Sequence, residues 1–389
     1  MRILHLIHSE GVYGAELILV YLAREMQRLG HEVIVGSMRD PGTPTTDFEK
    51  FCADTGLAVE PIRVPPRPTP AVIRTLLGVR RRIAPDLIHS HGYKADILLG
   101  LLPRRVRGPM LTTAHGWTDP PAFTSLWLYQ ALDRLSLRQL DRVVVVAPHM
   151  LAIDAVRGLP RGRCTVIENG IPSLPQRLAD QRSRGVSALP ATLQQFVTRR
   201  PTLVAIGRLS QEKGFDVLLE AFAQARVQSP GFQLAIVGEG PERAALSATL
   251  ARLDLHEHVQ LAGYVEGADR VLGDARGFVM SSFTEGMPLA LLEAMQWNVP
   301  IVATAVGAIP HILEQGAGGA LVPPRDAGAL AEALRALMRR EAAVAQRTAT
   351  AAAAVNEKYS SARMAQSYCD VYGQMLGRLS GEMPARARA

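Results

Sequence analysis

Short apolar runs alternate with helical patterns along this chain, and the alternation constrains the fold more than any other feature. In the first half, residues 15–29 have helical periodicity, and the predicted strands are residues 2–8, 31–37, 87–90, 110–114 and 142–147. Strands separated by helices pair in parallel, because the chain must cross back over the sheet before each new strand. The first half therefore predicts a parallel α/β domain.

The same pattern restarts after a proline-rich stretch, residues 173–200. Helices are predicted over residues 215–226, 243–253, 326–340, 342–355 and 360–379, and strands over 202–207, 233–237, 259–262, 277–281, 301–303 and 320–322. We predict two doubly wound Rossmann-like domains, residues 1–172 and 201–359, joined by residues 173–200. Ligands bind beyond the carboxyl ends of such strands, so two domains facing each other through those ends would form a binding cleft.

The bulk composition restricts the classes of function. The three cysteines lie far apart, which disfavours disulfides and a structural zinc site and favours a reducing, cytoplasmic compartment. The run from Ile3 to Ile7 is too short for a signal peptide, and no stretch approaches the ~18 apolar residues of a membrane span. A net charge of +7 suits nucleic acid, an anionic membrane or an anionic substrate. Because no nucleic-acid-binding motif accompanies the charge, we do not expect nucleic acid as a partner.

The strongest local signal is the sequence SSFTEGMPLALLEA, which begins at Ser281. A strand ends there and a helix opens near Pro288, a residue that is favoured at the first helical position. Gly286 permits close approach of a ligand to the backbone. The backbone donors at this helix start belong to Met287, Leu289 and Ala290. Free N–H groups at the positive end of a helix dipole predict an anion site.

Two acids flank this helix start. Glu285 comes just before it, and Glu293 lies about a turn and a half inside the helix. Carboxylates so far apart are better placed to hold two hydroxyl-bearing parts of one extended ligand than to share a proton. Alternatively, Glu285 caps the helix and Glu293 is a solvated charge, although the apolar neighbours of Glu293 disfavour an exposed face.

Two glycine-containing loops of the second half could contact a nucleotide. The loop GRLSQEKG starts at Gly207 and offers Arg208 and Lys213, two cations suited to a diphosphate leaving group, or else a solvated turn. The turn VGEGP contains Gly238 and is only half of a dinucleotide fingerprint. After the next strand come Tyr264 and Val265, which could border a nucleotide base.

The first half offers a glycine loop, GVYGAE, in which Gly14 could approach a phosphate or sugar, although no P-loop lysine follows. His115 ends a predicted strand and could hydrogen-bond sugar hydroxyls or have a structural role. His89 and His91 have a spacing that could suit a metal. With no carboxylate or third histidine nearby in sequence, we favour a structural role or a cleft wall.

Together these segments resemble the retaining glycosyltransferases of family 4, which have the GT-B architecture of two Rossmann-like domains. The segments that carry the resemblance span nearly the whole chain. They are the E-x7-E motif Glu285–Glu293, Gly207-Arg208 with Lys213-Gly214, the loop ending Gly14-Ala15-Glu16, His115-Gly116, and Ile167-Glu168-Asn169-Gly170-Ile171. The sequence departs from many relatives at Ala147-Pro148-His149, where a serine is common, and after Gly170, where an acid often follows.

The resemblance implies a role for each matched residue. Glu293 would bind the ribose, Glu285 the transferred sugar, and Arg208 with Lys213 the diphosphate of a UDP-, GDP- or ADP-sugar. The backbone from Gly286 to Leu289 would donate to phosphate and sugar, His115 would contact the sugar near its 6-position, and Gly14 would let the first domain approach the diphosphate. The C-terminal helix, residues 360–380, would return to the first domain.

No cofactor or metal is expected, because the resemblance gives the charge neutralisation to Arg208 and Lys213. The acceptor would be a glycan or a polyprenyl-linked sugar in polysaccharide or lipopolysaccharide assembly. Arginine groups in the first domain, with Trp117, Phe123 and Trp127, would suit peripheral docking on an anionic membrane. Equally, these aromatic residues could be core and the arginines merely solvated. The alternatives are another GT-B enzyme, such as a nucleotide-sugar epimerase, and a non-catalytic sugar-nucleotide-binding protein.

Overall fold

The computed structural model describes residues 1–9, 11–65, 69–116, 125–186, 188–339 and 341–377. The chain divides into two compact units. The first contains residues 1–170 and the C-terminal residues from 361 on, and the second contains residues 171–360. Trp117 and Phe123 lie outside the described residues, as do the side chain of Trp127, residue 10 of the first glycine loop and residues 378–380 of the predicted last helix.

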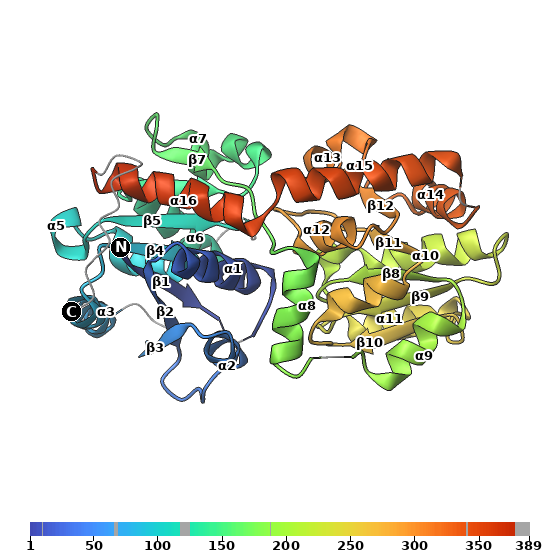
Figure 1. Cartoon of the computed structure of the whole chain (residues 1–389), viewed down its shortest axis with the longest axis horizontal. Coiled ribbons are helices and arrows are strands. Elements are labelled where there is room, and N and C mark those ends of the chain that lie inside the picture. The colour runs from blue at the N-terminus through green and yellow to red at the C-terminus, as the bar shows by residue number, and fades with distance from the viewer. Residues whose placement is uncertain (10, 66–68, 117–124, 187, 340, 378–389) are drawn as a thin grey trace. The chain divides into compact units, whose positions relative to one another are not determined.

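The first unit is a seven-stranded parallel sheet with helices on both faces (Figure 1). Its strands, in the spatial order β3-β2-β1-β4-β5-β6-β7, are β1 (Arg2–His8), β2 (Glu32–Arg39), β3 (Ala58–Arg63), β4 (Leu87–His91), β5 (Met110–Ala114), β6 (Arg142–Val145) and β7 (Cys164–Val166). Its helices are α1 (Gly14–Arg28), α2 (Asp47–Asp54), α3 (Pro70–Ile83), α4 (Tyr93–Ala95), α5 (Arg104–Arg107), α6 (Ser125–Leu137), α7 (Asp154–Arg157) and α16 (Ser361–Met375).

The central strands of this sheet are buried on both faces. Residues Ile3–Ile7 of β1 are all buried, as expected for a strand covered by helices on both sides. The C-terminal helix α16 packs against α1, and the Ser361 hydroxyl donates to Glu25 Oε1 at 2.7 Å. The last helix is therefore part of the core of the first unit.

The second unit is a six-stranded parallel sheet in the order β10-β9-β8-β11-β12-β13. The strands are β8 (Thr202–Ile206), β9 (Gln233–Val237), β10 (Val259–Gly263), β11 (Gly277–Met280), β12 (Ile301–Thr304) and β13 (Ala320–Val322). The helices are α8 (Leu174–Ser183), α9 (Ala191–Arg199), α10 (Phe215–Arg226), α11 (Arg243–Arg252), α12 (Leu289–Gln296), α13 (Ile309–Ile312), α14 (Ala327–Arg339) and α15 (Ala342–Lys358).

The prediction of two doubly wound parallel α/β units is confirmed. Two strands were not predicted. β3 contains Pro61, which disfavours a central strand, but β3 is the edge of its sheet, where proline is tolerated. β7 has only three residues and is too short to give a periodic signal. Residues 173–200, predicted as a connection, form α8 and α9 within the second unit.

Each sheet has one switch point, where neighbouring strands lead their connections away in opposite directions. The switch points lie between β1 and β4 in the first unit and between β8 and β11 in the second. Ligands of doubly wound sheets bind at such points, beyond the carboxyl ends of the strands. A ligand is therefore expected at the loops after β1, β4, β8 and β11. Among the described residues, no helix is long and apolar enough to cross a membrane.

Candidate active site

The loops that follow β8, β9 and β11 pack backbone against backbone at the switch point of the second unit. Gly238 has a φ of +149°, and a Cβ atom there would lie 1.9 Å from the carbonyl oxygen of Gly207. Gly214 has a φ of +59°, and a Cβ atom there would lie 2.4 Å from the carbonyl oxygen of Ser281. Only glycine fits at either position, because any side chain would drive the loops apart. The glycines thus bring three predicted segments together.

Lys213 and Glu285 form an ion pair at this point. Lys213 Nζ lies 2.6 Å from Glu285 Oε1, and the Ser282 hydroxyl donates to the same oxygen at 2.6 Å. The Ser281 hydroxyl also donates to the carbonyl oxygen of Lys213. The Glu285 side chain is almost buried, whereas that of Lys213 keeps 23% of its surface exposed. The sequence predicted a role for each residue but not their pairing.

Arg208 is the second cation of the loop that follows β8. It is exposed, and it forms no ion pair with any residue that the structure describes. Lys213 already faces Glu285, so the guanidinium of Arg208 is the available cation on this loop. A charged donor with a planar fork is suited to a phosphate group.

The helix that follows Glu285 begins one residue later than predicted. α12 starts at Leu289, and Pro288 is its N-cap residue with φ −73° and ψ 121°. The side chains of Met287 and Leu289 are buried, so a ligand there would meet their backbone rather than their side chains. The carbonyl oxygen of Gly286 accepts from Ala308 N at 3.2 Å, which ties the loop to the segment after β12.

Glu293, on α12, lies in a buried polar cluster. Its Oε1 atom lies 3.1 Å from Arg177 Nη1, and the same nitrogen lies 2.7 Å from Asp269 Oδ2. Burial and the neighbouring Asp269 raise the pKa of Glu293 to about 8, and Arg177 opposes this shift only in part. The reading of Glu293 as a solvated helix charge is therefore wrong, because the side chain is enclosed and paired.

Arg177 and Asp269 were missed by the sequence analysis. Arg177 lies on α8, in the segment predicted as a connection, and its side chain is only 2% exposed. It also donates to Gln296 Oε1 at 2.9 Å, and Gln181 donates to Asp269 at 2.6 Å. Arg177 is 116 positions from Glu293, so no local spacing pattern could connect them.

The residues predicted to border the base lie beside the Gly238 turn. Gly238 N donates to the carbonyl oxygen of Gly263 at 2.9 Å, which brings the end of β10 to this turn. Tyr264 follows and is 60% exposed, whereas the side chain of Val265 is buried. Of this pair, Tyr264 offers the ring surface for contact with a ligand.

In the first unit, the predicted His115 lies in a group of four histidines. His91 Nδ1 lies 3.2 Å from His115 Nε2, and His91 Nε2 lies 2.9 Å from His5 Nδ1. A third histidine, distant in sequence, does lie near His89 and His91 in space, because β1 and β4 pair in parallel with His5 opposite His89. Register between strands that are distant in sequence could not be predicted from local patterns.

Gly14 is the first residue of α1, beyond the carboxyl end of β1. A Cβ atom at this position would meet nothing within 4 Å in the described structure. The fold of the unit alone therefore does not require glycine here. Its predicted role, to admit a ligand close to the backbone, remains a prediction.

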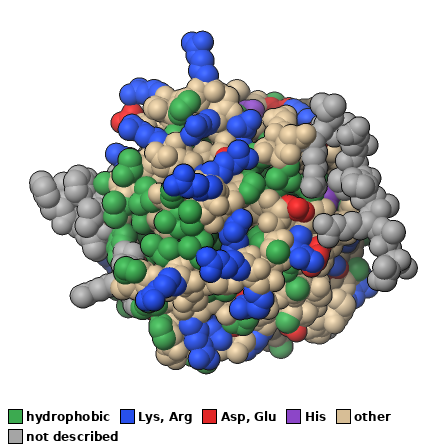
Figure 2. Space-filling view, turned by 90° about the vertical axis from the view of Figure 1, so that its left-hand side faces the viewer, with side chains coloured by type: hydrophobic (Ala, Val, Ile, Leu, Met, Phe, Trp, Pro, Cys, Tyr) green, Lys and Arg blue, Asp and Glu red, His purple; other side chains and the backbone are tan. Residues whose placement is uncertain are grey.

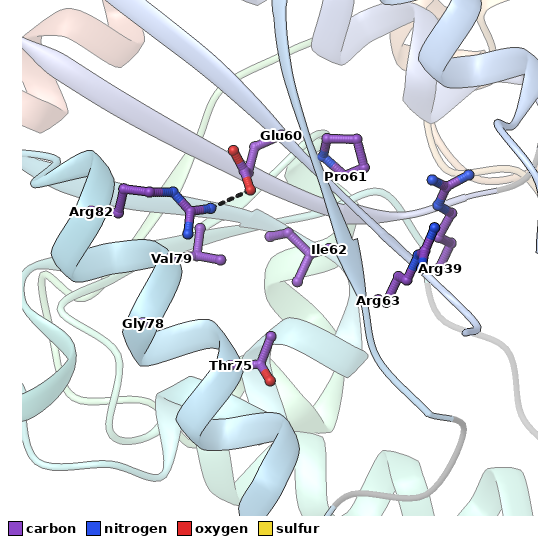
Figure 3. A pocket seen from close by; sticks show the side chains of 9 residues that line it. All are labelled: Arg39, Glu60, Pro61, Ile62, Arg63, Thr75, Gly78, Val79 and Arg82. Carbon is purple, nitrogen blue, oxygen red and sulfur yellow. Dashed lines mark hydrogen bonds and ion pairs between the residues drawn. The ribbon is translucent and has the colours of Figure 1, made fainter. Parts of the chain in front are cut away.

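A separate pocket of about 630 Å³ lies along the edge strand β3 and helix α3 (Figure 3). Arg39 and Arg63 are register partners at the carboxyl ends of β2 and β3, and both line it. At its other end Arg82 pairs with Glu60. None of the residues predicted from the sequence lines this pocket.

Comparisons with known proteins identify the family. The model of Glycosyltransferase Family 4 matches residues 12–173, and that of Glycosyl transferases group 1 matches residues 200–340. The putative colanic acid biosynthesis glycosyltransferase WcaL of Escherichia coli K12 is 34% identical over 59% of this chain and 55% of its own length. The amylovoran biosynthesis glycosyltransferase AmsK of Erwinia amylovora is 34% identical over 41% of each chain. The chain thus spans only about half the length of these relatives.

Other similarities extend over almost the entire chain. Phosphatidyl-myo-inositol mannosyltransferase of Mycobacterium leprae is 26% identical over 92% of both chains. The crystal structure of Anabaena HepE in complex with UDP-glucose superposes with a TM-score of 0.79 at 21% identity, covering 96% of this chain and all of that one. That likeness shows the GT-B fold. Since the two family models match the two α/β units in turn, the chain belongs to glycosyltransferase family 4.

Proposed function

We propose that this chain is a retaining glycosyltransferase that moves a sugar from a nucleotide-sugar donor to a glycan or lipid-linked acceptor. The observation that carries the proposal is the Lys213–Glu285 ion pair beside Arg208, a cation that forms no ion pair with any described residue, at the switch point of the second sheet. The names of WcaL and AmsK, which assign them to colanic acid and amylovoran biosynthesis, support polysaccharide assembly as the process.

The donor site follows from the charges on these loops. Arg208, Lys213 and the N-terminus of α12 would neutralise the diphosphate, and Glu285, once Lys213 turns to phosphate, would accept from sugar hydroxyls. Glu293, with one carboxylate oxygen held by Arg177, would offer the other to the ribose. HepE has been crystallised with UDP and with UDP-glucose, which makes a uridine diphosphate donor the first to test.

The transfer step needs no protein nucleophile. The bond between the anomeric carbon and the diphosphate oxygen breaks, and its electron pair stays on the phosphate. The acceptor hydroxyl attacks from the same face, and its proton passes to the departing phosphate oxygen. Since Arg208 and Lys213 supply the positive charge, we propose that the reaction needs no metal, and full activity in excess EDTA is the expected result.

The first unit is proposed to hold the acceptor. His115 would donate to the transferred sugar, and the β3 pocket with Arg39 and Arg63 would bind an anionic group of the acceptor. Figure 2 views the side of this unit on which Figure 1 places α3 and α5, and it shows Lys and Arg side chains interspersed with hydrophobic ones. Exposed residues of α3 and α5 include Arg74, Arg81, Arg104, Arg105 and Val106. This surface supports peripheral binding to the inner face of an anionic membrane.

The experiment that tests the donor site is a panel of UDP-, GDP- and ADP-sugars, scored by thermal shift and by release of the nucleoside diphosphate. We expect one nucleotide class to stabilise the protein, and its sugar form to release diphosphate when an acceptor extract is added. Release without an extended acceptor would favour an epimerase. Stabilisation without release under any acceptor condition would favour a non-catalytic binding protein. No stabilisation by any nucleotide would contradict the transferase, the epimerase and the binding protein alike.

A further inference from the structure

Three of the four clustered histidines of the first unit have no part in the proposed function. His5, on β1, and His89 and His91, on β4, are buried at the switch point of the sheet. His115, which follows β5, is half-buried. Because buried polar groups are costly unless they are hydrogen-bonded, the pattern of bonds among these rings reports what they do.

His5, His91 and His115 form one continuous chain of rings. The distance from His5 Nδ1 to His91 Nε2 is 2.9 Å, and that from His91 Nδ1 to His115 Nε2 is 3.2 Å. The ring centroids are 5.2 and 5.5 Å apart, which exceeds the N···N distance by 2.3 Å in both pairs. The planes of each pair differ by less than 30°. The rings are therefore joined nitrogen to nitrogen, edge to edge, as hydrogen bonding requires.

All three rings are neutral at physiological pH. Burial lowers the pKa of His5 to about 3 and that of His115 to about 4, and burial with the neighbouring histidines lowers the pKa of His91 well below its ordinary value. A neutral imidazole has one N–H group and one acceptor nitrogen. Each N···N contact then holds a single hydrogen, so the two bonds must point in the same direction along the chain.

Only two arrangements satisfy this condition. In the first, His5 donates to His91 and His91 donates to His115, so that His115 carries its hydrogen on Nδ1. In the second, all bonds are reversed, and His5 carries a hydrogen on Nε2. That Nε2 atom is buried and has no hydrogen-bond partner among the described residues. An orphaned buried N–H group is rarer in proteins than an unsatisfied acceptor, so the first arrangement is favoured.

The fourth histidine, His89, packs beside this chain of histidine rings. His89 Nδ1 lies 2.7 Å from the Tyr372 hydroxyl and Nε2 lies 2.7 Å from the Thr113 hydroxyl, which in turn contacts the Tyr368 hydroxyl at 2.7 Å. Burial raises the pKa values of both tyrosines, so both keep their hydroxyl hydrogens. The His89 and His91 ring centroids are 4.1 Å apart. Tyr372 of helix α16 thus holds the His89 ring, which packs on His91 in the middle of the chain of histidine rings.

We propose that His5 and His91 are positioning residues that fix His115 as its Nδ1–H tautomer. His115 then presents a single hydrogen-bond donor, suited to an oxygen acceptor such as a sugar hydroxyl or a phosphate oxygen. The nature of that substrate rests on the proposed function, but the tautomer does not. A metal ion is the competing use of this group, because ligand atoms of His5, His89 and His91 lie within 4.8 Å of one another. Both nitrogens of His89 are already engaged by hydroxyl groups, which favours the hydrogen-bonded chain.

The test is long-range ¹⁵N–¹H NMR of the full-length protein labelled with ¹⁵N-histidine, which reports the tautomer of each ring. We expect His115, assigned through His115→Ala, to be protonated on Nδ1, and the exposed His256 to serve as the unconstrained reference. In His5→Phe the direction of the chain is no longer set, so His115 should shift toward the Nε2–H form that free histidine prefers. An Nε2–H tautomer of His115 in the unsubstituted protein would overturn the proposal even if His5→Phe does not fold.

Two further outcomes are decisive. A His115 tautomer unchanged in folded His5→Phe would also contradict the proposal, because it would show that the chain does not set it. If stoichiometric Zn²⁺ changes the ¹⁵N chemical shifts of the His5, His89 and His91 rings together, the three rings form a metal site and the proposed chain of hydrogen bonds is wrong. The readout does not depend on turnover, so failure of the donor panel would overturn the proposed function and leave the tautomer to be decided by itself.

Discussion

One guanidinium nitrogen of Arg177 lies between two carboxylates, 2.7 Å from Asp269 Oδ2 and 3.1 Å from Glu293 Oε1. All three side chains are buried. A single positive charge cannot neutralise two enclosed acids, and the shorter contact goes to Asp269. Glu293 is the acid that keeps its proton, and its pKa rises to about 8. The cluster thus holds one shared cation and one bound proton.

The first prediction concerns the dependence of stability on pH. Glu293 has a pKa of about 8 in the folded protein and 4.5 as its ordinary value, so folding binds a proton between these limits. The contribution of this group to the free energy of unfolding is present below pH 4.5 and is lost as the pH rises through 8. It amounts to roughly a few kcal/mol. For Glu293→Gln, the free energy of unfolding measured with urea should therefore fall less between pH 5 and pH 9 than that of the unsubstituted protein.

The matched control is Glu332→Gln, because Glu332 is a surface acid on α14 that pairs with Arg335. Its unfolding free energy should follow that of the unsubstituted protein over the same range. Equal slopes for unsubstituted protein and Glu293→Gln would show that Glu293 is ionised throughout.

The second prediction concerns Arg177 itself. Arg177→Met keeps much of the apolar volume but removes the charge, which leaves Asp269 facing Glu293 without a cation. Breaking a buried ion pair on one side costs about 3–5 kcal/mol, so the variant should unfold at markedly lower urea. The double variant Arg177→Met with Asp269→Asn should recover part of the loss, because Asp269 is the acid that Arg177 contacts at the shorter distance. A double variant as unstable as the sum of both single changes would mean that the two residues are not coupled.

The fold could be predicted because each α/β repeat leaves a local signal. Helix α10 and strands β9 and β13 begin and end where the periodicity predicts, since apolar residues there face one continuous core. β3 could not be predicted, because the edge of a sheet accepts Pro61 and needs no strong strand propensity. Local patterns identify elements whose burial is regular and can miss elements at the edges of the sheets.

The residues of the site also differ in whether a local pattern could predict them. Glu285, Lys213 and the glycines of their loops lie within short motifs and were predicted as separate groups. The ion pair between Lys213 and Glu285 joins residues 72 positions apart, and the pairing of His5 with His91 spans 86. These contacts depend on which strands are neighbours and on their register. A single sequence has no local signal for either.

The third prediction tests the charge on the β8 loop. Lys213→Ala removes the cation that faces Glu285 and would neutralise the diphosphate, so turnover should fall by about 10²-fold or more, as for loss of one strong donor to the transition state. Steady-state kinetics with the donor found in the panel would measure it. Lys358→Ala removes a surface lysine of the same unit that pairs with Glu314 and should leave turnover unchanged. Near-normal turnover in Lys213→Ala would remove this residue from the catalytic site.

The last prediction concerns the pocket beside β3, where two arginines end neighbouring strands. Arg39 is almost buried and its guanidinium faces Glu49 at 3.3 Å, while its Nε atom has no hydrogen-bond partner among the described residues. Arg63, its register partner, is exposed and is paired with no described residue. Arg63 therefore offers the unneutralised charge of the pocket, and an anionic acceptor group would meet it first.

Arg63→Ala should raise the KM for an anionic acceptor by about tenfold or more, the effect of losing one charge-assisted hydrogen bond of about 1.5–3 kcal/mol. The KM for the donor and the melting temperature should stay unchanged, because Arg63 holds no other described residue in place. Arg252→Ala, which breaks an exposed pair with Glu220 in the second unit, controls for loss of surface charge. An acceptor KM that is equal in both variants would place acceptor binding elsewhere. A rise that disappears at high salt would point instead to long-range attraction, since a contact inside the pocket is less screened than a surface charge.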